Sequence, residues 1–257
     1  MYPYVIFDLD GTLLHNYQQT VPKEIYDTIK ALHEKGIIFT AASGRQYANI
    51  RRLFAPLGFD IPYIAENGSM CVYKEEVLAT GLTPSKTIRH ILDALMEYRK
   101  IYHTGHCILS VKDTYYSDST DERFIDYMEN DMHNIVTYVP DLYAIKEPII
   151  KAAICGTKNL EPFFHKRIGD EIRVVTSADH WIDFIAPNAN KGTALKVLME
   201  KFGIKKEECI CFGDQQNDIE MLKAAGTAYV MATGHPLAKK AADYVVESPL
   251  PVMQGLL

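Results

Sequence analysis

The chain has 257 residues, of which 47% are hydrophobic, and a formal net charge of −6. This composition is ordinary for a globular protein and supplies enough apolar side chains for one large domain or two modest ones. An acidic chain lacks the general positive field that binds nucleic acid or an anionic membrane surface. No segment approaches the ~20 apolar residues that cross a bilayer. We therefore expect a soluble protein that binds neither nucleic acid nor membrane, and we infer no obligate protein partner.

The cysteines and the amino terminus indicate a cellular compartment. The five cysteines form no C-x-x-C pair, and a chain of this size does not need disulfides to fold. Asp8 and Asp10 interrupt the first hydrophobic run, which argues against a secretory leader. A cytoplasmic location is the expectation.

The first part of the chain alternates between strand and helix patterns. Tyr4–Asp8 is a short apolar run that predicts a buried strand, and a helix follows from about Pro22 to Gly36. Ile37–Ala41 predicts a second strand, residues 46–57 a second helix, and Tyr63–Ala65 a third strand. This β-α-β-α-β order is the signature of a parallel sheet.

The same rhythm returns near the carboxyl end. Lys191–Phe202 predicts a helix and Cys209–Phe212 a strand, and a helix through Met221 precedes another strand at Tyr229–Met231. Both parts are expected to complete one doubly wound parallel α/β sheet.

The segment between them has a different pattern. Trp181–Phe184 alternates as a hairpin strand would, whereas residues 88–95 carry a helical apolar face. We predict that residues 82–186 form an inserted α/β domain, and that residues 1–81 and 187–257 form the catalytic core.

Polar residues follow three of the predicted core strands. In doubly wound sheets, ligands bind beyond the carboxyl ends of the strands, where these side chains would gather. The clusters are Asp8 with Asp10, Ser43 alone, and Asp214 with Asn217 and Asp218.

Together these residues predict phosphoryl transfer. An aspartate such as Asp8 is a poor nucleophile unless a metal and a cation neutralise the charge of the attacked phosphoryl group. Asp214 could bind the metal as Mg²⁺, and Lys191 could supply the cation. Mg²⁺ prefers oxygen ligands and commonly takes one or two protein carboxylates. Ser43 can donate a hydrogen bond to phosphate at a helix start. Asp10 is left to protonate the leaving group and then to activate water.

Four motifs in order resemble the haloacid dehalogenase superfamily, specifically its Cof-type sugar-phosphatase-like branch. The Glu66-Asn67-Gly68 segment also matches this branch. The resemblance implies a Rossmann-like core with a specificity cap inserted between the second and third motifs. The four motifs are Asp8-Leu9-Asp10-Gly11-Thr12, Ser43-Gly44-Arg45, Lys191-Gly192 and Gly213-Asp214-Gln215-Gln216-Asn217-Asp218.

The resemblance also implies a role for each motif residue. It assigns Asp8 as nucleophile, Asp10 as acid and base, and Lys191 as a catalytic cation. Magnesium is assigned to Asp8, Asp214 and the backbone carbonyl of Asp10, and Asp218 is expected to support the metal through water or hydrogen bonds. Phosphate contacts are assigned to Thr12, Ser43, Gly44, Lys191 and Asn217.

Simpler interpretations exist for single residues. A lone Lys191 would usually be a surface residue of an amphipathic helix. Arg45 could contact phosphate or only complete the helix start. Cys209 and Cys211 share a strand face, but their apolar neighbours favour packing over metal binding. Thr233 stands where the branch usually has asparagine, which puts that loop's contact to the site in doubt.

The predicted function is hydrolysis of small phosphomonoesters, such as sugar phosphates, through an aspartyl-phosphate. A phosphomutase of the same superfamily is an alternative, because the core motifs do not decide whether water or a sugar accepts the phosphoryl group. A protein that binds a phosphorylated metabolite without turnover is another. Dehalogenation is disfavoured because Asp10 supplies the proton-transfer group of phosphoryl transfer.

Overall fold

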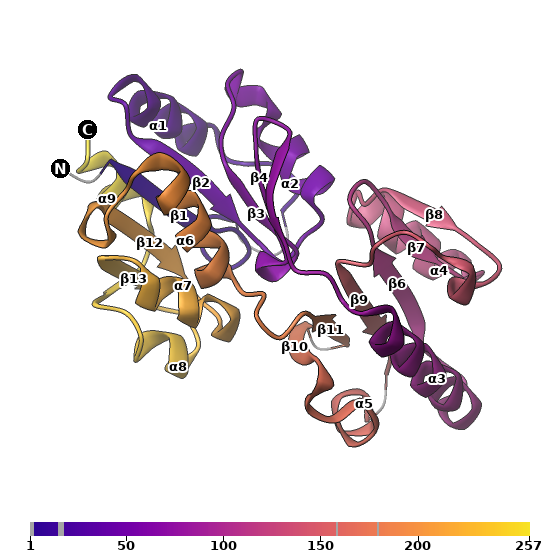
Figure 1. Cartoon of the computed structure of the whole chain (residues 1–257). Helices are drawn as coiled ribbons and strands as arrows, with labels where there is room; N and C mark the ends of the chain where they lie inside the picture. The colour runs from indigo at the N-terminus through magenta and orange to yellow at the C-terminus, as the bar shows by residue number, and fades with distance from the viewer. Residues whose placement is uncertain (1–2, 15–17, 158, 179) are drawn as a thin grey trace. The chain divides into compact units, whose positions relative to one another are not determined.

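The chain folds into two compact units in a computed structural model that describes residues 3–14, 18–157, 159–178 and 180–257. The core unit comprises Met1–Ala79 and Asn190–Leu257, and the inserted unit comprises Thr80–Ala189. Both are drawn in Figure 1. The sequence placed the two boundaries at 81/82 and 186/187, within three residues of these positions.

The described part of the core unit contains an eight-stranded sheet in the order β14-β13-β12-β1-β2-β3-β4-β5. The pairings from β14 to β3 are all parallel, which confirms the predicted parallel core, and β3 pairs with β4 antiparallel. The strands are β1 (Tyr4–Asp8), β2 (Ile38–Ala42), β3 (Tyr63–Ala65), β4 (Met70–Tyr73), β5 (Glu76–Thr80), β12 (Cys209–Gly213), β13 (Thr227–Met231) and β14 (Tyr244–Val246).

Helices cover both faces of this sheet (Figure 1). α6 and α7 pack on one face with the alternate strand residues Tyr4 and Ile6, and on the other face Phe54 of α2 contacts Phe39 of β2. The helices are α1 (Lys23–Glu34), α2 (Tyr47–Phe54), α6 (Lys191–Phe202), α7 (Ile219–Ala224), α8 (Pro236–Lys239) and α9 (Leu250–Gln254), with short 3₁₀ turns at Ala55–Leu57, Glu66–Gly68, Lys206–Glu208 and Gln216–Asp218.

A row of aromatic rings holds five neighbouring strands of the core sheet together. Phe39, Phe7, Phe212, Tyr229 and Tyr244 stack in that order with ring centroids 4.3–5.4 Å apart. Each aromatic pair contributes about 0.5–1.5 kcal/mol beyond the apolar area that it buries. The stack fixes the strand register, and with it the carboxyl edge at which β1 and β12 end.

The described part of the inserted unit contains a six-stranded sheet in the order β10-β11-β9-β6-β7-β8. α3 and α5 cover one face, where Tyr98 and Phe164 are fully buried. The elements are α3 (Ser85–Tyr102), β6 (His106–Ser110), β7 (Tyr115–Ser117), α4 (Glu122–Asp126), a π-turn (Tyr127–Asp131), β8 (Val136–Tyr138), a 3₁₀ turn (Leu142–Ala144), β9 (Lys151–Cys155), α5 (Leu160–Ile168), a 3₁₀ turn (Gly169–Glu171), β10 (Arg173–Ala178) and β11 (Trp181–Ile185).

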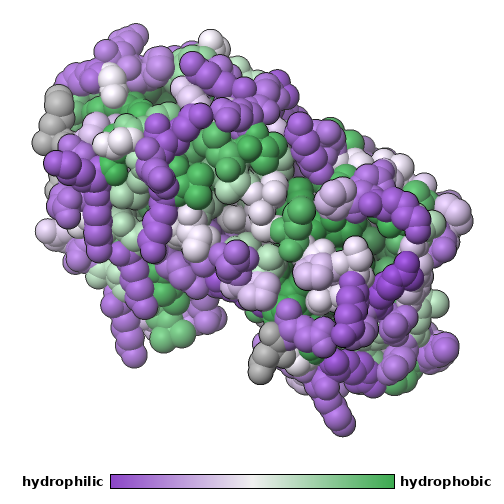
Figure 2. Space-filling view, viewed as in Figure 1, coloured by the Kyte–Doolittle hydropathy of each residue, from purple (hydrophilic) through white to green (hydrophobic). Residues whose placement is uncertain are grey.

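Hydrophilic side chains cover most of the visible face, with apolar residues in patches between them (Figure 2). Within the part of the chain that the structure describes, no helix is both long enough and apolar enough to cross a bilayer.

Candidate active site

The acidic clusters meet at the carboxyl edge of the core sheet. Asp8 is the last residue of β1 and pairs in register with Ala42 of β2, so that Ser43 follows directly beside it. On the other side, Phe7 pairs with Phe212, and Asp214 comes directly after β12. The parallel register therefore brings the first, second and fourth motifs to one edge, as ligand sites in such sheets require.

Lys191 joins two of the acids in the interior. It is the first residue of α6 and is fully buried, and its Nζ lies 2.5 Å from Asp8 Oδ1 and 2.6 Å from Asp218 Oδ1. A lysine is almost never buried this completely without such partners. The other carboxylate oxygen of Asp218 accepts the backbone N–H groups of Asp214, at 2.9 Å, and Gln215, at 3.0 Å. Asp218 thus positions both Lys191 and the loop that carries Asp214.

Asp214 packs against the turn that follows β1. Gly11 has φ +91°, and a β-carbon at this position would strike the Asp214 carboxylate. The Asp214 carboxylate accepts hydrogen bonds from the Gln215 side-chain amide at 3.1 Å and, more distantly, from Thr12 Oγ1 at 3.4 Å. The turn therefore depends on glycine both for its backbone conformation and for its closeness to Asp214.

Three buried carboxylates, Asp8, Asp214 and Asp218, face the single Lys191 ammonium. One oxygen from each acid lies within 4.8 Å of the others. Burial and the Asp218 charge raise the pKa of Asp8 well above its usual range, although Lys191 opposes the shift, and the same two causes raise the pKa of Asp214. Burial alone would lower the pKa of Lys191, but Asp218 and Asp8 outweigh it and raise it.

The same cluster fits a divalent metal. Asp8 Oδ2 is buried and has no hydrogen-bond partner among the described residues, which leaves a carboxylate oxygen available as a ligand. A divalent cation would bring the formal charge of three carboxylates and one ammonium to zero, and carboxylate oxygens suit hard cations. Both Asp218 oxygens already bind Lys191 and backbone amides, so Asp8 and Asp214 are the carboxylates that remain for a metal.

Asp10 lies outside this acidic cluster and pairs with Arg45. Arg45 Nε lies 2.8 Å from Asp10 Oδ2 and Nη2 lies 2.5 Å from Asp10 Oδ1, a two-pronged ion pair. The Asp10 carboxylate is therefore engaged by Arg45 and is not part of the cluster of Asp8, Asp214 and Asp218.

The predicted phosphate-contact residues lie on adjoining loops. Ser43 is buried, its Oγ accepts the Arg45 backbone N–H at 3.1 Å, and its carbonyl accepts the Asn67 backbone N–H at the same distance. A β-carbon on Gly44 would come within 2.8 Å of Asn67 Oδ1. The Asn217 side-chain amide donates to that same Oδ1 at 2.9 Å. Asn67 thus links the second and fourth motifs.

The loop containing Thr233 reaches the site through its backbone. The His235 N–H donates to the Asp214 carbonyl at 2.7 Å, and the Gly234 N–H donates to the Met231 carbonyl at 2.8 Å. Such bonds do not depend on the side chain at residue 233. The Asp214 loop is therefore held without the asparagine that the resembled branch usually has at this position.

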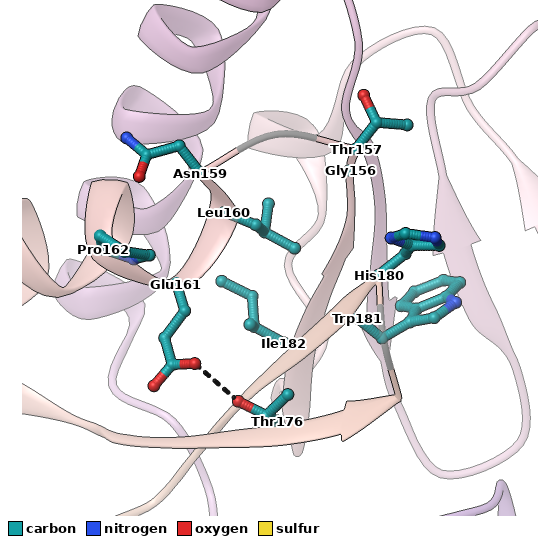
Figure 3. A pocket seen from close by; sticks show the side chains of 10 residues that line it. All are labelled: Gly156, Thr157, Asn159, Leu160, Glu161, Pro162, Thr176, His180, Trp181 and Ile182. Carbon is teal, nitrogen blue, oxygen red and sulfur yellow. Dashed lines mark hydrogen bonds between the residues drawn. The ribbon is translucent and has the colours of Figure 1, made fainter.

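A separate cavity of about 250 Å³ lies within the inserted unit (Figure 3). Leu160 and Ile182 line its apolar part, and a hydrogen bond of 3.1 Å between Thr176 and Glu161 crosses its rim. His180 and Trp181 lie side by side at another edge (Figure 3). The lining residues include none of the predicted site residues.

The family model for haloacid dehalogenase-like hydrolases matches residues 5–249, nearly the whole chain. The chain belongs to this family. The match confirms the resemblance that the four motifs predicted, and it makes the chain an enzyme of a hydrolase family.

Relatives and solved structures agree with this membership. The hydrolase is 30% identical to MG265 of Mycoplasma genitalium, whose name assigns it provisionally as a phosphatase, over 95% of this chain and 92% of that protein. It is 25% identical to the Escherichia coli 5-amino-6-(5-phospho-D-ribitylamino)uracil phosphatase YbjI, over 93% and 89% of the two chains. The crystal structure of TM0651 from Thermotoga maritima superposes with a TM-score of 0.84 at 25% identity, covering 99% of this chain and 97% of that one.

Two residues of this hydrolase make contacts in the site that the sequence did not indicate. Arg45 was left between a phosphate contact and a helix start, and the structure places it on Asp10. Asn67 was noted only as part of a branch motif, yet it bonds to both Ser43 and Asn217. The Asn67-Gly68 pair was a usable sequence signal, because asparagine before glycine favours left-handed turns, and Asn67 indeed has a φ of +58°.

Proposed function

We propose that this haloacid dehalogenase-like hydrolase is a magnesium-dependent phosphatase of small phosphomonoesters, with Asp8 as nucleophile. One observation carries the proposal: Asp8 is buried, with one carboxylate oxygen on Lys191 and the other without a partner among the described residues. Most buried carboxylate oxygens are hydrogen-bonded, so an oxygen without a partner beside Lys191 is a candidate ligand or nucleophile. The adjacent Asp214 supplies a second oxygen ligand.

The proposed reaction has two displacements at phosphorus. An Asp8 oxygen forms a bond to phosphorus while the bond between phosphorus and the ester oxygen breaks, and Asp10 gives its proton to the leaving alkoxide. Asp10, now ionised, takes a proton from water, whose oxygen attacks the phosphorus of the aspartyl-phosphate. Inorganic phosphate leaves and Asp8 is restored. Lys191 neutralises charge that accumulates beside Asp8 during both steps.

The phosphate and metal contacts are part of the proposal. We assign phosphate oxygens to Lys191, Ser43, Gly44, Thr12 and Asn217, whose loops adjoin Asp8. The Mg²⁺ ligands are the carboxylates of Asp8 and Asp214 and the carbonyl of Asp10. When bound, Mg²⁺ would supply Lewis-acid polarisation of the phosphoryl group. Asp218 supports the arrangement through its bonds to Lys191 and to the Asp214 loop.

The substrate class is inferred from a relative and from the inserted unit. The relative YbjI is named for a phosphorylated ribityl compound, which is a small phosphomonoester. We propose that this chain acts on a phosphorylated metabolite of similar size and that residues 82–186 supply selectivity for its leaving group. A cytoplasmic location is consistent with five free cysteines.

The test is a phosphate-release screen over sugar phosphates, nucleotides, polyol phosphates and pyridoxal phosphate, with Mg²⁺ and with a chelator. Asp8→Asn is expected to abolish release while the fold is retained. The matched control is Asp27→Asn, because Asp27 is an exposed acid on α1. Metal-dependent release by Asp8→Asn at the wild-type rate would contradict the mechanism. An isomerised sugar phosphate formed with little free phosphate would identify a mutase instead.

A further inference from the structure

All of the hydrogen-bond donors of the Arg45 side chain face acceptors within the protein. A guanidinium has five N–H groups in a fixed plane. Nε and Nη2 donate to the two oxygens of Asp10. Nη2 also donates to the Gln18 carbonyl, with an N···O distance of 3.2 Å. Nη1 donates to Gln19 Oε1 and to Asn49 Oδ1, with an N···O distance of 3.4 Å in each case. No N–H remains for a phosphate oxygen, which disfavours the phosphate-contact interpretation of this residue.

The surroundings hold Arg45 in one orientation. Its side chain is 5% exposed, whereas that of Asp10 is 22% exposed, so the arginine is the fixed partner and the acid is the accessible one. The Arg45 backbone N–H donates to Ser43 Oγ, and Asn49, which accepts from Arg45 Nη1, lies in the first turn of α2. An arginine with few remaining rotamers orients a carboxylate better than a mobile lysine does.

We propose that Arg45 is the positioning residue for Asp10, and this inference rests on the proposed function. The two-pronged contact from Arg45 Nε and Nη2, here called the fork, fixes the plane of the Asp10 carboxylate and occupies one lone pair on each oxygen. A carboxylate has about four such sites, so sites remain on this partly exposed group for the proton of the attacking water. When Asp10 carries the proton that it gives to the leaving group, its other oxygen still accepts a hydrogen bond from Arg45, which keeps the carboxyl group in place.

This role predicts a dependence on the leaving group. An alkoxide needs a proton as it leaves, whereas p-nitrophenolate leaves without one at neutral pH. Loss of a positioned general acid therefore slows the alkyl ester more than the aryl ester, within the ~10²–10⁴-fold that such catalysis contributes. The pair p-nitrobenzyl phosphate and p-nitrophenyl phosphate have similar shapes and differ in this respect.

The experiment measures kcat/KM for both esters with saturating Mg²⁺, because kcat/KM reports the steps up to phosphorylation of Asp8 and excludes the later hydrolysis, in which Asp10 acts alike for both esters. Arg45→Lys retains the charge and removes the fork. Arg52→Lys is the matched control, because Arg52 lies on α2, which follows Arg45 in the chain, and binds the Gln19 carbonyl and side chain but not Asp10. Arg45→Gln provides a second measure, because its amide can still donate to one Asp10 oxygen. Thermal unfolding of each variant reports whether the fold is intact.

The expected result is that Arg45→Lys lowers kcat/KM at least ~10-fold on the benzyl ester and less than ~3-fold on the phenyl ester. Arg45→Gln is expected to fall between Arg45→Lys and wild type, and Arg52→Lys is expected to match wild type. Adding Arg45→Lys to Asp10→Asn is expected to cause little further loss, because the two residues act as a unit.

Two results would overturn the inference. Equal losses on both esters with a raised KM would make Arg45 a phosphate contact, and additive losses in the double variant would separate it from Asp10. Neither result depends on the nucleophile. Turnover that persists in Asp8→Asn would instead contradict the proposed function, whatever Arg45 does.

Discussion

At the scale of single residues, the site is governed by excess negative charge. Burial and the neighbouring Asp218 raise the pKa of Asp214 above its ordinary value of 3.8, so the folded chain binds this proton more tightly than the unfolded chain does. Ionised Asp214 therefore opposes folding of the metal-free protein once the pH rises above that ordinary value. A bound divalent cation removes this repulsion.

Replacing Asp214 with asparagine separates the two effects. Asp214→Asn is expected to leave the metal-free unfolding temperature at pH 7 equal to or above that of wild type, because one repelling charge is gone. Mg²⁺ is expected to raise the unfolding temperature of wild type, by a free energy of about 2.7 kcal/mol at 100 times Kd, and not that of the variant. Calorimetry with and without Mg²⁺ measures both. An equal Mg²⁺ effect in the two proteins would remove Asp214 from the metal site.

At the scale of elements, the turn after β1 ties the nucleophile strand to the metal loop. Gly11 and Gly36 both have positive φ, +91° and +77°, but only Gly11 has atoms within 4 Å of where a β-carbon would stand. These are the side-chain atoms of Asp214. The two glycines therefore share a backbone requirement and differ in their contact with the site.

Alanine at each position tests this difference. Gly36→Ala is expected to destabilise the fold by about 1 kcal/mol through its positive φ alone, with kcat unchanged. Gly11→Ala is expected to destabilise it by at least as much and to displace Asp214, so that phosphate release falls more than ~100-fold. Denaturant unfolding and phosphate-release assays provide the two readouts. Full activity in folded Gly11→Ala would show that the close packing on Asp214 is dispensable.

The elements that sequence could predict are those whose patterns are local. The short apolar run of β1 and the helical face of α1 were both predictable, but the predicted helix 46–57 ends as α-helix at Phe54, because Pro56 lacks an N–H and the chain tightens into a 3₁₀ turn. The β4–β5 connection at Lys74 and Glu75 was missed, since both adopt positive φ without the Asn or Gly that marks such turns.

The candidate site also has a part that local patterns predict and a part that they do not. Asp8, Lys191 and Asp214 stand in fixed motifs and were named from the sequence. The pairing of Arg45 with Asp10 joins residues 35 positions apart, and nothing in the local pattern distinguishes it from a helix start. Three-dimensional proximity of this kind follows only from the register of β1 against β2.

At the scale of the whole molecule, all five cysteines are free and they lie in both units. Burial raises the pKa of the Cys71 and Cys209 thiols to about 12 and that of the half-buried Cys155 to about 11. Burial also raises the pKa values of Cys107 and Cys211. At pH 8 all five are therefore neutral thiols, and the thiolate is the reactive form.

Thiol titration tests this packing. The native protein is expected to react with an aromatic disulfide reagent only slowly at pH 8, at Cys155, and five thiols are expected to react in denaturant. Cys155→Ser is the control and is expected to abolish the slow native reaction. Rapid labelling of two or more thiols in the native state would contradict the buried environment of Cys71 and Cys209.

The central claim is that Asp8 becomes covalently phosphorylated during turnover. Acid quenching within the first turnover, with a phosphomonoester labelled at phosphorus and Mg²⁺ present, traps the acyl phosphate, and peptide mapping locates the label. The account predicts label on the peptide containing Asp8 in wild type and none in Asp8→Asn. Label on another residue, or phosphate release by Asp8→Asn at the wild-type rate, would contradict it.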